Sequence, residues 1–389
     1  MNANNYIELR LPKITFEMPI TDSIMELEKL RYKILRGTTH PHVFFQLRHI
    51  FHMLESIGSS RIEGNNTTVM DYIETAKLQN KHSYLFNNEE DIQEIENVES
   101  AMNYIEQNIS DIEINKMFLR ELHLMTVKNL SVKREGAANP GEFRRSNVRI
   151  SGSVHIPPDY MQVEPLVDEL IKFLNSHNSP KYDLLKIAIS HHRFVWIHPF
   201  ENGNGRVVRL FTYALLLKYI FQSRDRIINP TAVFCSDRNK YYEYLAKADT
   251  GTDKGLIDWA EYVLSGLKIE IEKIDKLIDY DYLQSKILLP TLADAFDKKY
   301  ITPQEYAILK VTINRQVMQA GDIKPILHEK TGSDISRLIK GLIGKQMLRP
   351  LHAGARKYTI AFSNNFLLRS ILTVLDQNDF LPRNNVLTS

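Results

Sequence analysis

The sequence contains a single cysteine, Cys235, in 389 residues. One thiol excludes an internal disulfide framework and any zinc site built from several thiolates, and it is typical of a reducing compartment. Long apolar runs are also missing: the best, Leu210–Phe221, has 12 residues and contains Lys218, whereas a bilayer span needs about 18. The first ten residues include Glu8 and lack the apolar run of a secretory signal. These absences predict a soluble, cytoplasmic protein with no membrane partner.

Net charge is small as well, since 49 Lys and Arg against 47 Asp and Glu give +2. Apolar residues make up 43% and charged residues 25%, which excludes disordered, collagen-like and coiled-coil chains. The balance hides an uneven distribution. Residues 82–115 hold nine acids and no Lys or Arg, whereas residues 285–389 hold 15 basic and 8 acidic residues, a net +7. We interpret the acidic stretch as the solvated face of a helix, without a function, and the basic stretch as a separate domain.

Apolar residues recur at three- and four-residue spacing along most of the chain, which predicts a mainly α fold. The length indicates two or three domains, and we expect an N-terminal helical region at 1–110, a central domain at 111–280 and a C-terminal domain at 285–389. The clearest expected helices are Ile24–Leu35, Val43–Ile57, Ile92–Gln107, Lys116–Leu130, Val163–Asn175, Leu184–Val195, Arg206–Phe221 and Leu256–Ile278.

One segment, Gly141–Pro158, departs from the helical spacing. Val148, Ile150 and Ile156 alternate with polar residues on the two sides of Ser151-Gly152-Ser153. Alternation around a Gly/Ser turn predicts a β-hairpin. A lone hairpin in a helical protein is often a lid or a docking edge.

The most informative segment is His198–Arg209, which reads HPFENGNGRVVR and precedes an apolar helix. Asn202-Gly203-Asn204-Gly205 permits sharp turns that point successive N–H groups into one concavity, at a helix N-terminus that favours an anion. Arg206 and Arg209 share one helix face, where positive charge is unfavourable unless an anion is bound. The segment therefore indicates a polyphosphate site.

His198 lies at the mouth of this loop, because Pro199 restricts it to an extended conformation. A neutral imidazole can take a proton from an attacking hydroxyl, so the pair of features suggests transfer of a phosphate-containing group onto a hydroxyl. Taken singly, a Gly-Asn-Gly loop is usually a plain turn, a single His is more often structural, and two arginines on a helix are commonly solvated. The combination over twelve residues favours the functional interpretation.

The segment resembles the motif of the Fic domain family, HPFx[D/E]GNGRxxR, and matches it at every defined position but one. The resemblance covers roughly residues 115–270 and implies a Fic-type helical core with a β-hairpin flap. Further residues that resemble the family are His191–Ile197 before the motif, Gly141, Arg144 and Pro157-Pro158 in the flap, and Lys240, Tyr241, Tyr242 and Leu245 after it.

The resemblance implies an adenylyltransferase that moves AMP from ATP, with Mg²⁺, onto a Tyr, Ser or Thr hydroxyl of a target protein while pyrophosphate leaves. His198 would be the general base. Asn204 and the Gly203–Gly205 backbone would hold the α-phosphate, and Arg206 and Arg209 the β- and γ-phosphates.

Two further roles follow from the same resemblance. Tyr241 and Tyr242 would lie near the adenine, although both could equally be ordinary aromatics of a helix face. The flap would align the target segment by strand-like pairing, through Ser151, Gly152, Ser153, Val154 and His155.

The one departure from the motif falls at Asn202, where the family has an acid that ligates Mg²⁺. An amide oxygen is a weaker Mg²⁺ ligand than a carboxylate, and Glu201 is one residue out of register. The metal site and the identity of the phosphate donor therefore stay open.

Ser59-Ser60-Arg61-Ile62-Glu63-Gly64 follows an expected helix, and Gly64 is a plausible helix stop. Beside the Fic motif it resembles the family's inhibitory pattern [S/T]xxxE[G/N], with matches at Ser59, Glu63 and Gly64. We expect Glu63 to pair bidentately with Arg209 and so to keep ATP out of the productive pose.

The C-terminal segment resembles a winged helix. Thr302–Glu305 begins a helix with a capping box, Ile323–His328 and Ser333–Leu342 are further helices, and Arg349–Ile360 is a hairpin. Such a module could bind DNA or serve as a protein-interaction or dimerisation platform. The basic residues that would contact DNA are Arg337, Lys340, Lys345, Arg356 and Lys357.

Other functions stay open. The chain could be a nucleotide-sensing DNA-binding regulator in which the Fic core performs no transfer, or a related enzyme that uses another phosphate donor or removes AMP. Self-modification is possible because tyrosines are plentiful, 18 in all, and so is a homodimer.

Overall fold

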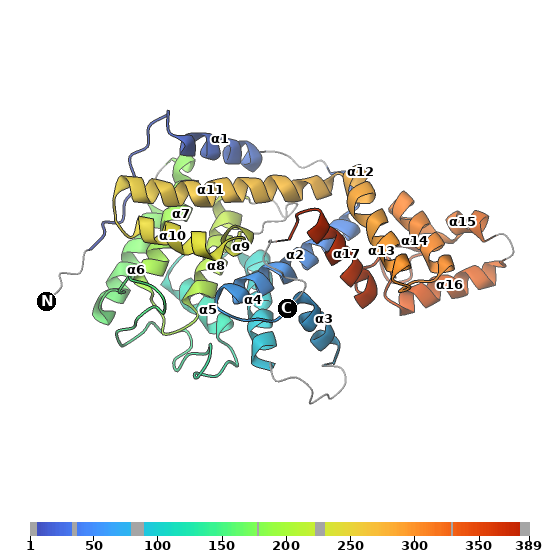
Figure 1. Ribbon diagram of the computed structural model, residues 1–389, viewed down its shortest axis with the longest axis horizontal. Coiled ribbons are helices and arrows are strands. Elements are labelled where there is room, and N and C mark those ends of the chain that lie inside the picture. The colour runs from blue at the N-terminus through green and yellow to red at the C-terminus, as the bar shows by residue number, and fades with distance from the viewer. Residues whose placement is uncertain are drawn as a thin grey trace. The chain divides into compact units, whose positions relative to one another are not determined.

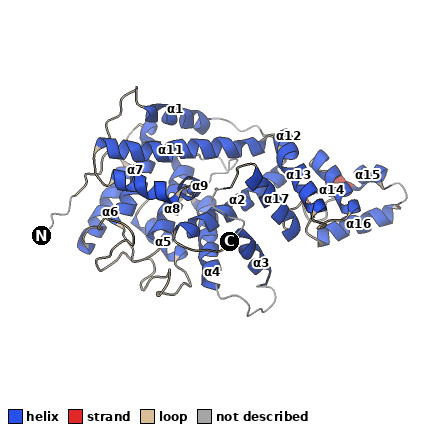
Figure 2. Ribbon diagram, in the orientation of Figure 1, coloured by secondary structure: helices blue, strands red, loops and turns tan. Residues whose placement is uncertain are grey.

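The computed structural model describes residues 6–32, 37–78, 89–176, 179–221, 230–327 and 330–381. Helices dominate these residues, and strands occur in one small sheet (Figure 2). The chain forms two compact units: one comprises Met1–Ile34, His52–Thr67 and Ser83–Ile271, and the other Leu35–Phe51, Thr68–His82 and Glu272–Ser389. Over the described ranges, no helix is both long and apolar enough to cross a membrane.

The first unit contains the HPFENGNGRVVR segment and is built from helices around one core (Figure 1). Two long helices, α2 (Pro41–Ile62) and α11 (Asp253–Asp275), also contribute residues to the second unit. The remaining helices of the first unit are α1 (Pro19–Tyr32), α4 (Glu89–Asn108), α5 (Lys116–Thr126), α6 (Tyr160–Asn175), α7 (Asp183–Ile197), α8 (Asn204–Leu215), α9 (Thr231–Cys235) and α10 (Arg238–Ala248), with a 3₁₀ turn at Pro180–Tyr182 and a π-helical turn at Leu216–Ile220.

Helices α7 and α8 form the centre of this unit and pack against each other. In α7, 13 of the 15 residues are buried, and in α8, 11 of the 12. Trp259 of α11 anchors α7 from the other side, because its indole N–H donates to the Ala188 carbonyl at 2.7 Å. The loop between α7 and α8 is therefore held at both ends by helices that cannot move without opening the core.

The structure confirms the expected helices with one exception and corrects some of their ends. In place of the short helix expected at Ile323–His328, an α-helical turn ends at Ile323 and a 3₁₀ turn follows at Lys324–Ile326. Helix α2 continues to Ile62, five residues beyond the predicted end at Ile57, so Ser59 lies inside the helix rather than after it. Helix α5 ends at Thr126 instead of Leu130. The predicted ends at Leu35 and His328 lie outside the described residues.

The flap, Gly141–Pro158, contains a turn but no pair of strands. The Ser153 N–H donates to the Ile150 carbonyl at 3.2 Å, whereas no ladder connects the two arms. Pro157 and Pro158 lack the N–H groups that a ladder needs. The Arg144 guanidinium instead bonds to backbone carbonyls of both arms, those of Ser146 and Pro158. A buried side chain thus holds the arms together where the sequence predicts a hairpin.

The second unit holds a small three-stranded antiparallel sheet of order β1-β3-β2. Helix α14 begins with the predicted Thr302–Glu305 capping box, and the chain then runs through β1, α15, α16, β2 and β3, an order compatible with the winged-helix interpretation. Its elements are α3 (Val69–Leu78), α12 (Tyr280–Tyr282), α13 (Leu289–Asp297), α14 (Pro303–Arg315), β1 (Met318–Gln319), α15 (Ala320–Ile323), α16 (Gly332–Gly344), β2 (Leu348–Pro350), β3 (Lys357–Ile360) and α17 (Asn365–Gln377), with turns of 3₁₀ or π type at Lys276–Ile278, Leu283–Leu288 and Lys324–Ile326.

Candidate active site

The loop between α7 and α8 has the backbone geometry of an anion site. Gly203 precedes α8 with φ 74° and, as its N-cap residue, has no side chain to cap the N–H groups of the first turn; uncapped N–H groups at a helix N-terminus favour an anion. The Asn204 side chain closes the loop, because it accepts from the Phe200 N–H at 2.9 Å and donates to the Phe200 carbonyl at 2.8 Å. Asn204 therefore shapes the loop with both ends of its amide, and the backbone is left to contact a phosphate.

Arg209 is 2% exposed and lies against the end of α2. Its Nε donates to Ser59 Oγ, and its Nη2 donates to the Ser59 carbonyl and to Glu63 Oε1, each at 2.8 Å. The expected bidentate Glu63–Arg209 pair is therefore wrong in detail: one carboxylate oxygen binds Arg209, since Ser59 already accepts from the other side of the guanidinium. The segment at the end of α2 thus holds Arg209 through two residues four positions apart, Ser59 and Glu63.

Glu63 itself lies on the phosphate loop. A Cβ added to Gly205 would come within 1.9 Å of Glu63 Oε1, so a glycine at 205 is required for the carboxylate to approach. Burial raises the pKa of Glu63, but the charges of Arg209, Arg206 and Arg238 outweigh it and hold the pKa below its ordinary value. Glu63 is therefore ionised at neutral pH, and its carboxylate lies beside Gly205 and Arg209.

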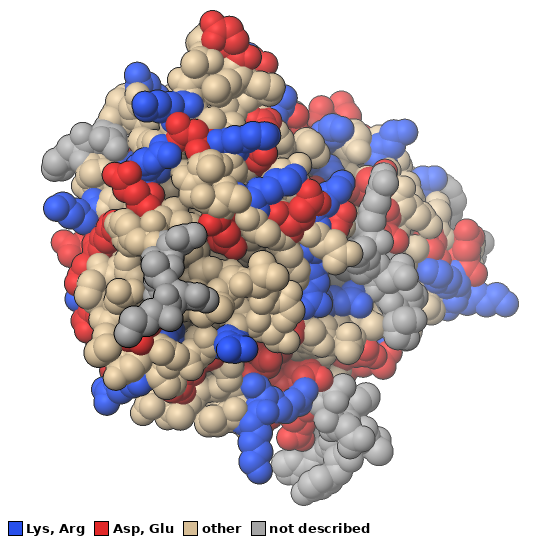
Figure 3. Space-filling view, turned by 60° about the vertical axis from the view of Figure 1, so that its left-hand side comes forward, with Lys and Arg blue, Asp and Glu red and all other residues tan. Residues whose placement is uncertain are grey.

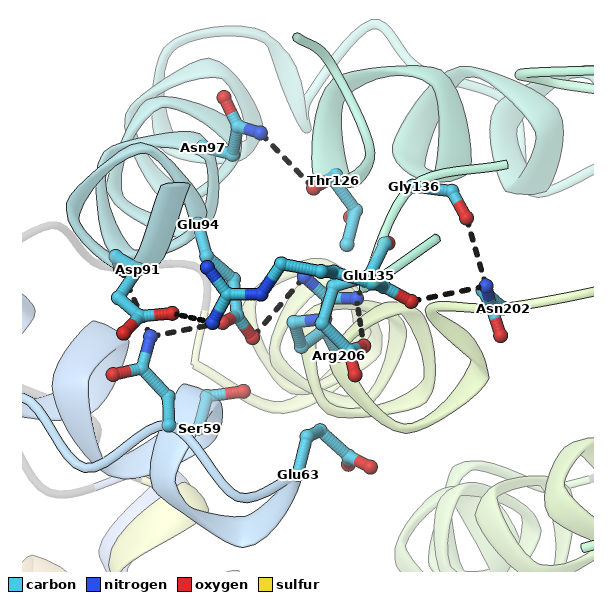
Figure 4. Close-up of polar contacts among 12 residues, drawn as sticks. Ser59, Glu63, Asp91, Glu94, Asn97, Thr126, Glu135, Gly136, Asn202 and Arg206 are labelled. Carbon is cyan, nitrogen blue, oxygen red and sulfur yellow. Dashed lines mark hydrogen bonds and ion pairs between the residues drawn. The ribbon is translucent and has the colours of Figure 1, made fainter. Parts of the chain in front are cut away.

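Arg206 is fully buried and is held by two other acids. Its Nη1 lies 3.1 Å from Glu94 Oε1, and its Nη2 lies 2.8 Å from Glu135 Oε2 and donates to the Glu135 carbonyl at 3.1 Å. Figure 4 shows the Arg206 guanidinium between these two carboxylates. Glu94 belongs to the acidic stretch that the sequence indicates is solvated. That interpretation is wrong for Glu94, which is 2% exposed, because a cation far along the chain neutralises it.

Asn202 occupies the motif position where an acid was expected. Its Nδ2 donates to the Gly136 carbonyl at 2.8 Å and more weakly to the Arg134 carbonyl at 3.4 Å, which ties the Glu135 loop to the motif (Figure 4). The side chain thus offers a cation only its neutral amide oxygen. Within the described ranges, no three His, Cys, Asp or Glu side chains form a group that could hold a metal ion. These residues do not fit a resident metal.

His198 ends α7 in the left-handed conformation, with φ 50° and ψ 62°, so the extended conformation predicted from Pro199 is wrong. Arg144 holds it there: the Arg144 Nε donates to the His198 carbonyl and the Arg144 backbone N–H to the Pro199 carbonyl, both at 2.9 Å. Burial lowers the pKa of His198 to about 4, and the Arg144 charge acts in the same direction. The imidazole is therefore neutral at pH 7 and can accept a proton.

Residues 113–216, which contain all of this loop and both arginines, match the Fic/DOC family. A curated relative, the protein adenylyltransferase Fic of Drosophila yakuba, is 32% identical over 213 residues, which are 54% of this chain and 38% of the relative. The chain contains a Fic domain. The match spans little more than a third of that relative's length.

Solved structures share the fold. A Fic family protein from Desulfovibrio desulfuricans aligns over 90% of this chain and 98% of its own, with a TM-score of 0.54 and 19% identity. A Fic domain containing signaling protein from Bacteroides thetaiotaomicron aligns over 67% of this chain and 97% of its own, with a TM-score of 0.51 and 20% identity. The mainly helical Fic fold expected from the sequence is thus confirmed.

His123 is a site residue of the Fic domain that sequence reasoning missed. Its ring stacks on Phe200 of the motif, with 3.9 Å between centroids and 8° between planes, and its Nδ1 accepts from the Gly141 N–H at 2.9 Å. Burial lowers the pKa of His123 to about 4, so it stays neutral and supports the loop and the base of the flap. A lone His in an amphipathic helix gives no signal that would reveal this.

The flap turn points four residues to solvent. Ser151, Gly152, Ser153 and Val154 are exposed, and Val154 reaches 94%. His155 differs, because its Nε2 lies 2.8 Å from the Trp196 carbonyl near the end of α7. The exposed turn is free to meet another chain, whereas His155 fastens the flap to the helix that carries His198.

The two tyrosines assigned to the adenine side lie in different environments. Tyr241 is 2% exposed and packs among core aromatics, and its hydroxyl lies 2.9 Å from His191 Nε2. Tyr242 is 42% exposed, and its hydroxyl accepts from Arg238 Nε at 3.3 Å. Only Tyr242 of the pair presents a face that a base could stack on.

The predicted DNA-contacting residues of the C-terminal module are partly neutralised. Lys345 lies 2.6 Å from Glu305, and Arg337 lies 3.6 Å from Asp334, whereas Arg356 on the hairpin is exposed. Figure 3 draws one face of the molecule, and on the described residues of that face basic and acidic side chains are interspersed.

Proposed function

We propose that the chain is a protein adenylyltransferase that transfers AMP from ATP to a Tyr, Ser or Thr hydroxyl of a target protein, and that Glu63 inhibits it. The observation that carries this proposal is the Glu63 carboxylate, an anion seated on the Gly205 backbone and bound to Arg209. A loop that accepts this anion has the shape and charge to accept a phosphate. The name of the Drosophila relative supports AMP as the transferred group.

The chemistry follows from the placement of the charged groups. His198 takes the proton of the target hydroxyl, whose oxygen attacks the α-phosphorus. A new P–O bond forms, the bond from the α-phosphorus to the bridging oxygen of pyrophosphate breaks, and pyrophosphate leaves with the electron pair. The backbone N–H groups of Gly203–Gly205 stabilise charge on the α-phosphate, and Arg206 and Arg209 neutralise the leaving group.

Inhibition follows from competition for the same donors. While Glu63 and Ser59 occupy Arg209, the γ-phosphate lacks its arginine and the α-phosphate lies out of line with the attacking oxygen. A misplacement of about 1 Å can cost roughly 100-fold in rate. ATP must therefore displace Glu63 before transfer, or a partner must withdraw it.

Mg²⁺ would arrive with the nucleotide rather than reside in the protein, since Asn202 offers only its amide oxygen. Mg²⁺ is commonly held by substrate phosphates and waters with few protein ligands. The exposed flap turn around Val154 would meet the target chain. We further propose that residues 285–389 form a winged-helix module and residues 111–280 the transferase.

The test is label transfer from α-³²P-ATP with Mg²⁺ to a lysate of acceptor proteins and to the chain itself. We compare the wild type, Glu63→Gly and Glu63→Gly/His198→Ala. Label is expected with the single mutant, with little from the wild type and none from the double mutant. Glu113→Gln, at an exposed acid, is the matched control and should behave as the wild type.

Absence of label with Glu63→Gly would refute AMP transfer from ATP. Tight ATP binding in that case would favour a nucleotide-sensing regulator, and label from another nucleotide would favour a different donor. Equal labelling by the wild type and by Glu63→Gly would show that Glu63 does not by itself inhibit transfer.

A further inference from the structure

Glu94 contacts Arg206 but has no part in the proposed function. It lies on α4 and is 2% exposed, and each of its carboxylate oxygens lies close to a polar group. Oε1 lies 3.1 Å from Arg206 Nη1, and Oε2 accepts from Asn65 Nδ2 at 2.8 Å. Burial raises the pKa of Glu94, and the Arg206 charge opposes that rise. Glu94 therefore joins Arg206 to Asn65.

Asn65 directly follows the inhibitory segment and is itself rigid. It is 7% exposed. Its backbone N–H donates to the Ser60 carbonyl at 3.2 Å, its Oδ1 accepts from the Thr67 N–H at 2.9 Å, and its Nδ2 donates to the Asp91 carbonyl of α4 at 2.9 Å. One backbone bond and two side-chain bonds fix Asn65, which therefore places the Glu94 carboxylate in one position.

The two acids that hold Arg206 differ in whether an incoming phosphate can displace them. The Glu135 side chain is 41% exposed and comes from a surface loop, so an incoming phosphate can take its place on Nη2. Glu94 is buried and bonded from behind by Asn65, so it stays when Glu135 leaves. Among the described residues, Arg206 Nε makes no hydrogen bond, whereas Nη1 stays paired with Glu94.

We propose that Glu94 is a positioning residue, which fixes the direction of the Arg206 guanidinium toward the β- and γ-phosphates, and that Asn65 holds Glu94 in place. This inference rests on the proposed role of the loop as a nucleotide phosphate site. An arginine fixed before binding loses less freedom when it grips a phosphate. A buried arginine that loses a buried partner turns toward whatever charge remains, which here is Glu135.

The positioning role predicts an effect on ATP that AMP does not share, because AMP lacks the β- and γ-phosphates. We measure equilibrium binding of ATP and AMP, with Mg²⁺, to the full chain in the Glu63→Gly background. Glu94→Gln preserves the shape and removes the charge. It should weaken ATP binding by about 10-fold, which corresponds to the loss of one charged hydrogen bond between Arg206 and a phosphate. AMP binding should stay within about twofold of that of the parent. Asn65→Ala should give a smaller loss, about threefold, in the same direction.

Other outcomes overturn the inference. ATP binding that tightens in Glu94→Gln would mean that Glu94 competes with the phosphates rather than positioning Arg206. Equal losses for ATP and AMP, with a lowered melting temperature, would mean a structural role only. Unchanged ATP binding in both variants would remove Glu94 from the site. Glu113→Gln is the control and should bind both nucleotides as its parent does.

Failure of this inference is distinguishable from failure of the proposed function. The binding ratio of ATP to AMP requires no transfer, so it tests Glu94 even if Glu63→Gly labels no protein. Conversely, label transfer by Glu63→Gly with an unchanged ratio in Glu94→Gln would leave the enzyme in place and refute only the positioning residue.

Discussion

Replacing Ser59 with alanine tests one part of the proposed inhibitory contact. The substitution removes the Oγ that accepts from Arg209 Nε at 2.8 Å, and leaves the Ser59 carbonyl and Glu63 in place. Ser59 and Arg209 are 1% and 2% exposed, so water does not readily replace the lost acceptor. We therefore expect Ser59→Ala to activate the enzyme partially, to a rate between those of the wild type and Glu63→Gly.

The size of the effect follows from the burial and charge of this bond. A hydrogen bond to a charged group is worth about 1.5–3 kcal/mol when it is lost in a buried site. If the inhibited state alone loses this bond, its population relative to the ATP-competent state falls by roughly 10- to 100-fold. Label transfer should rise by up to that factor, limited by the Glu63 contact that remains.

The neighbouring residue supplies the control. Ser60 is fully buried, and its hydroxyl has no hydrogen-bond partner among the residues that the structure describes. Ser60→Ala thus makes the same chemical change one position along α2 without touching Arg209. The assay is the initial rate of label transfer for both variants. Equal activation by Ser60→Ala would show that loosened packing, rather than Arg209, releases the enzyme. A wild-type rate for Ser59→Ala beside an active Glu63→Gly would refute a role for Ser59.

Three further predictions concern buried ionisable groups. Transfer by Glu63→Gly should be level from pH 8 to pH 6 and fall only at or below about pH 4, where His198 gains a proton. The pKa of His198 is lowered to about 4 even though the Glu63 charge raises it, so the loss of Glu63 lowers it further. Initial rates across this range test the prediction, and a midpoint near 6.5 contradicts it. Burial raises the pKa of Glu55 to about 8, so the folded state keeps a proton that the unfolded chain releases near pH 4.3, and stability from this group declines as pH rises between these values. Glu55→Gln, whose amide oxygen can still accept from the Thr231 N–H, should therefore melt higher than the wild type at pH 9 and similarly at pH 5. Arg144→Lys, in the Glu63→Gly background, should lower the rate of transfer more than about 10-fold while ATP binding persists. The lysine ammonium cannot replace the planar guanidinium that holds the His198 carbonyl. A parallel loss of ATP binding would contradict a role of Arg144 in holding His198.

Local patterns in the sequence predict much of this fold. Helical periodicity places the helices of the Fic domain, and the Thr302–Glu305 capping box marks the start of α14. The loop before α8 is also visible in the sequence, because Gly203 adopts a positive φ that few other residues permit and Gly205 leaves room for a close neighbour. Each of these signals lies within a few residues of the structure that it specifies.

Contacts between residues that lie far apart in the sequence cannot be predicted from local patterns. The charge of Glu94 is indistinguishable from that of its solvated neighbours until Arg206, on another helix, is brought beside it. The flap alternates as a hairpin does, yet Arg144 supplies the bonds that a strand ladder would. The resemblance implies that Asn204 contacts a phosphate, and the bonds of its amide to the Phe200 backbone are a further contact that the motif does not reveal. In each case a long-range or side-chain partner decides between local alternatives.

Gly205 has a consequence for attempts to improve this protein. It lies in the first turn of α8, and its backbone torsion is not of the left-handed kind that demands glycine. Routine stabilisation would replace such a residue with alanine, for a gain of about 1 kcal/mol in helix propensity. Here the added methyl would lie within 1.9 Å of the Glu63 carboxylate. A substitution chosen for thermal stability would thus displace Glu63 from the loop, so helix stability and the proposed inhibition make opposing demands on one position.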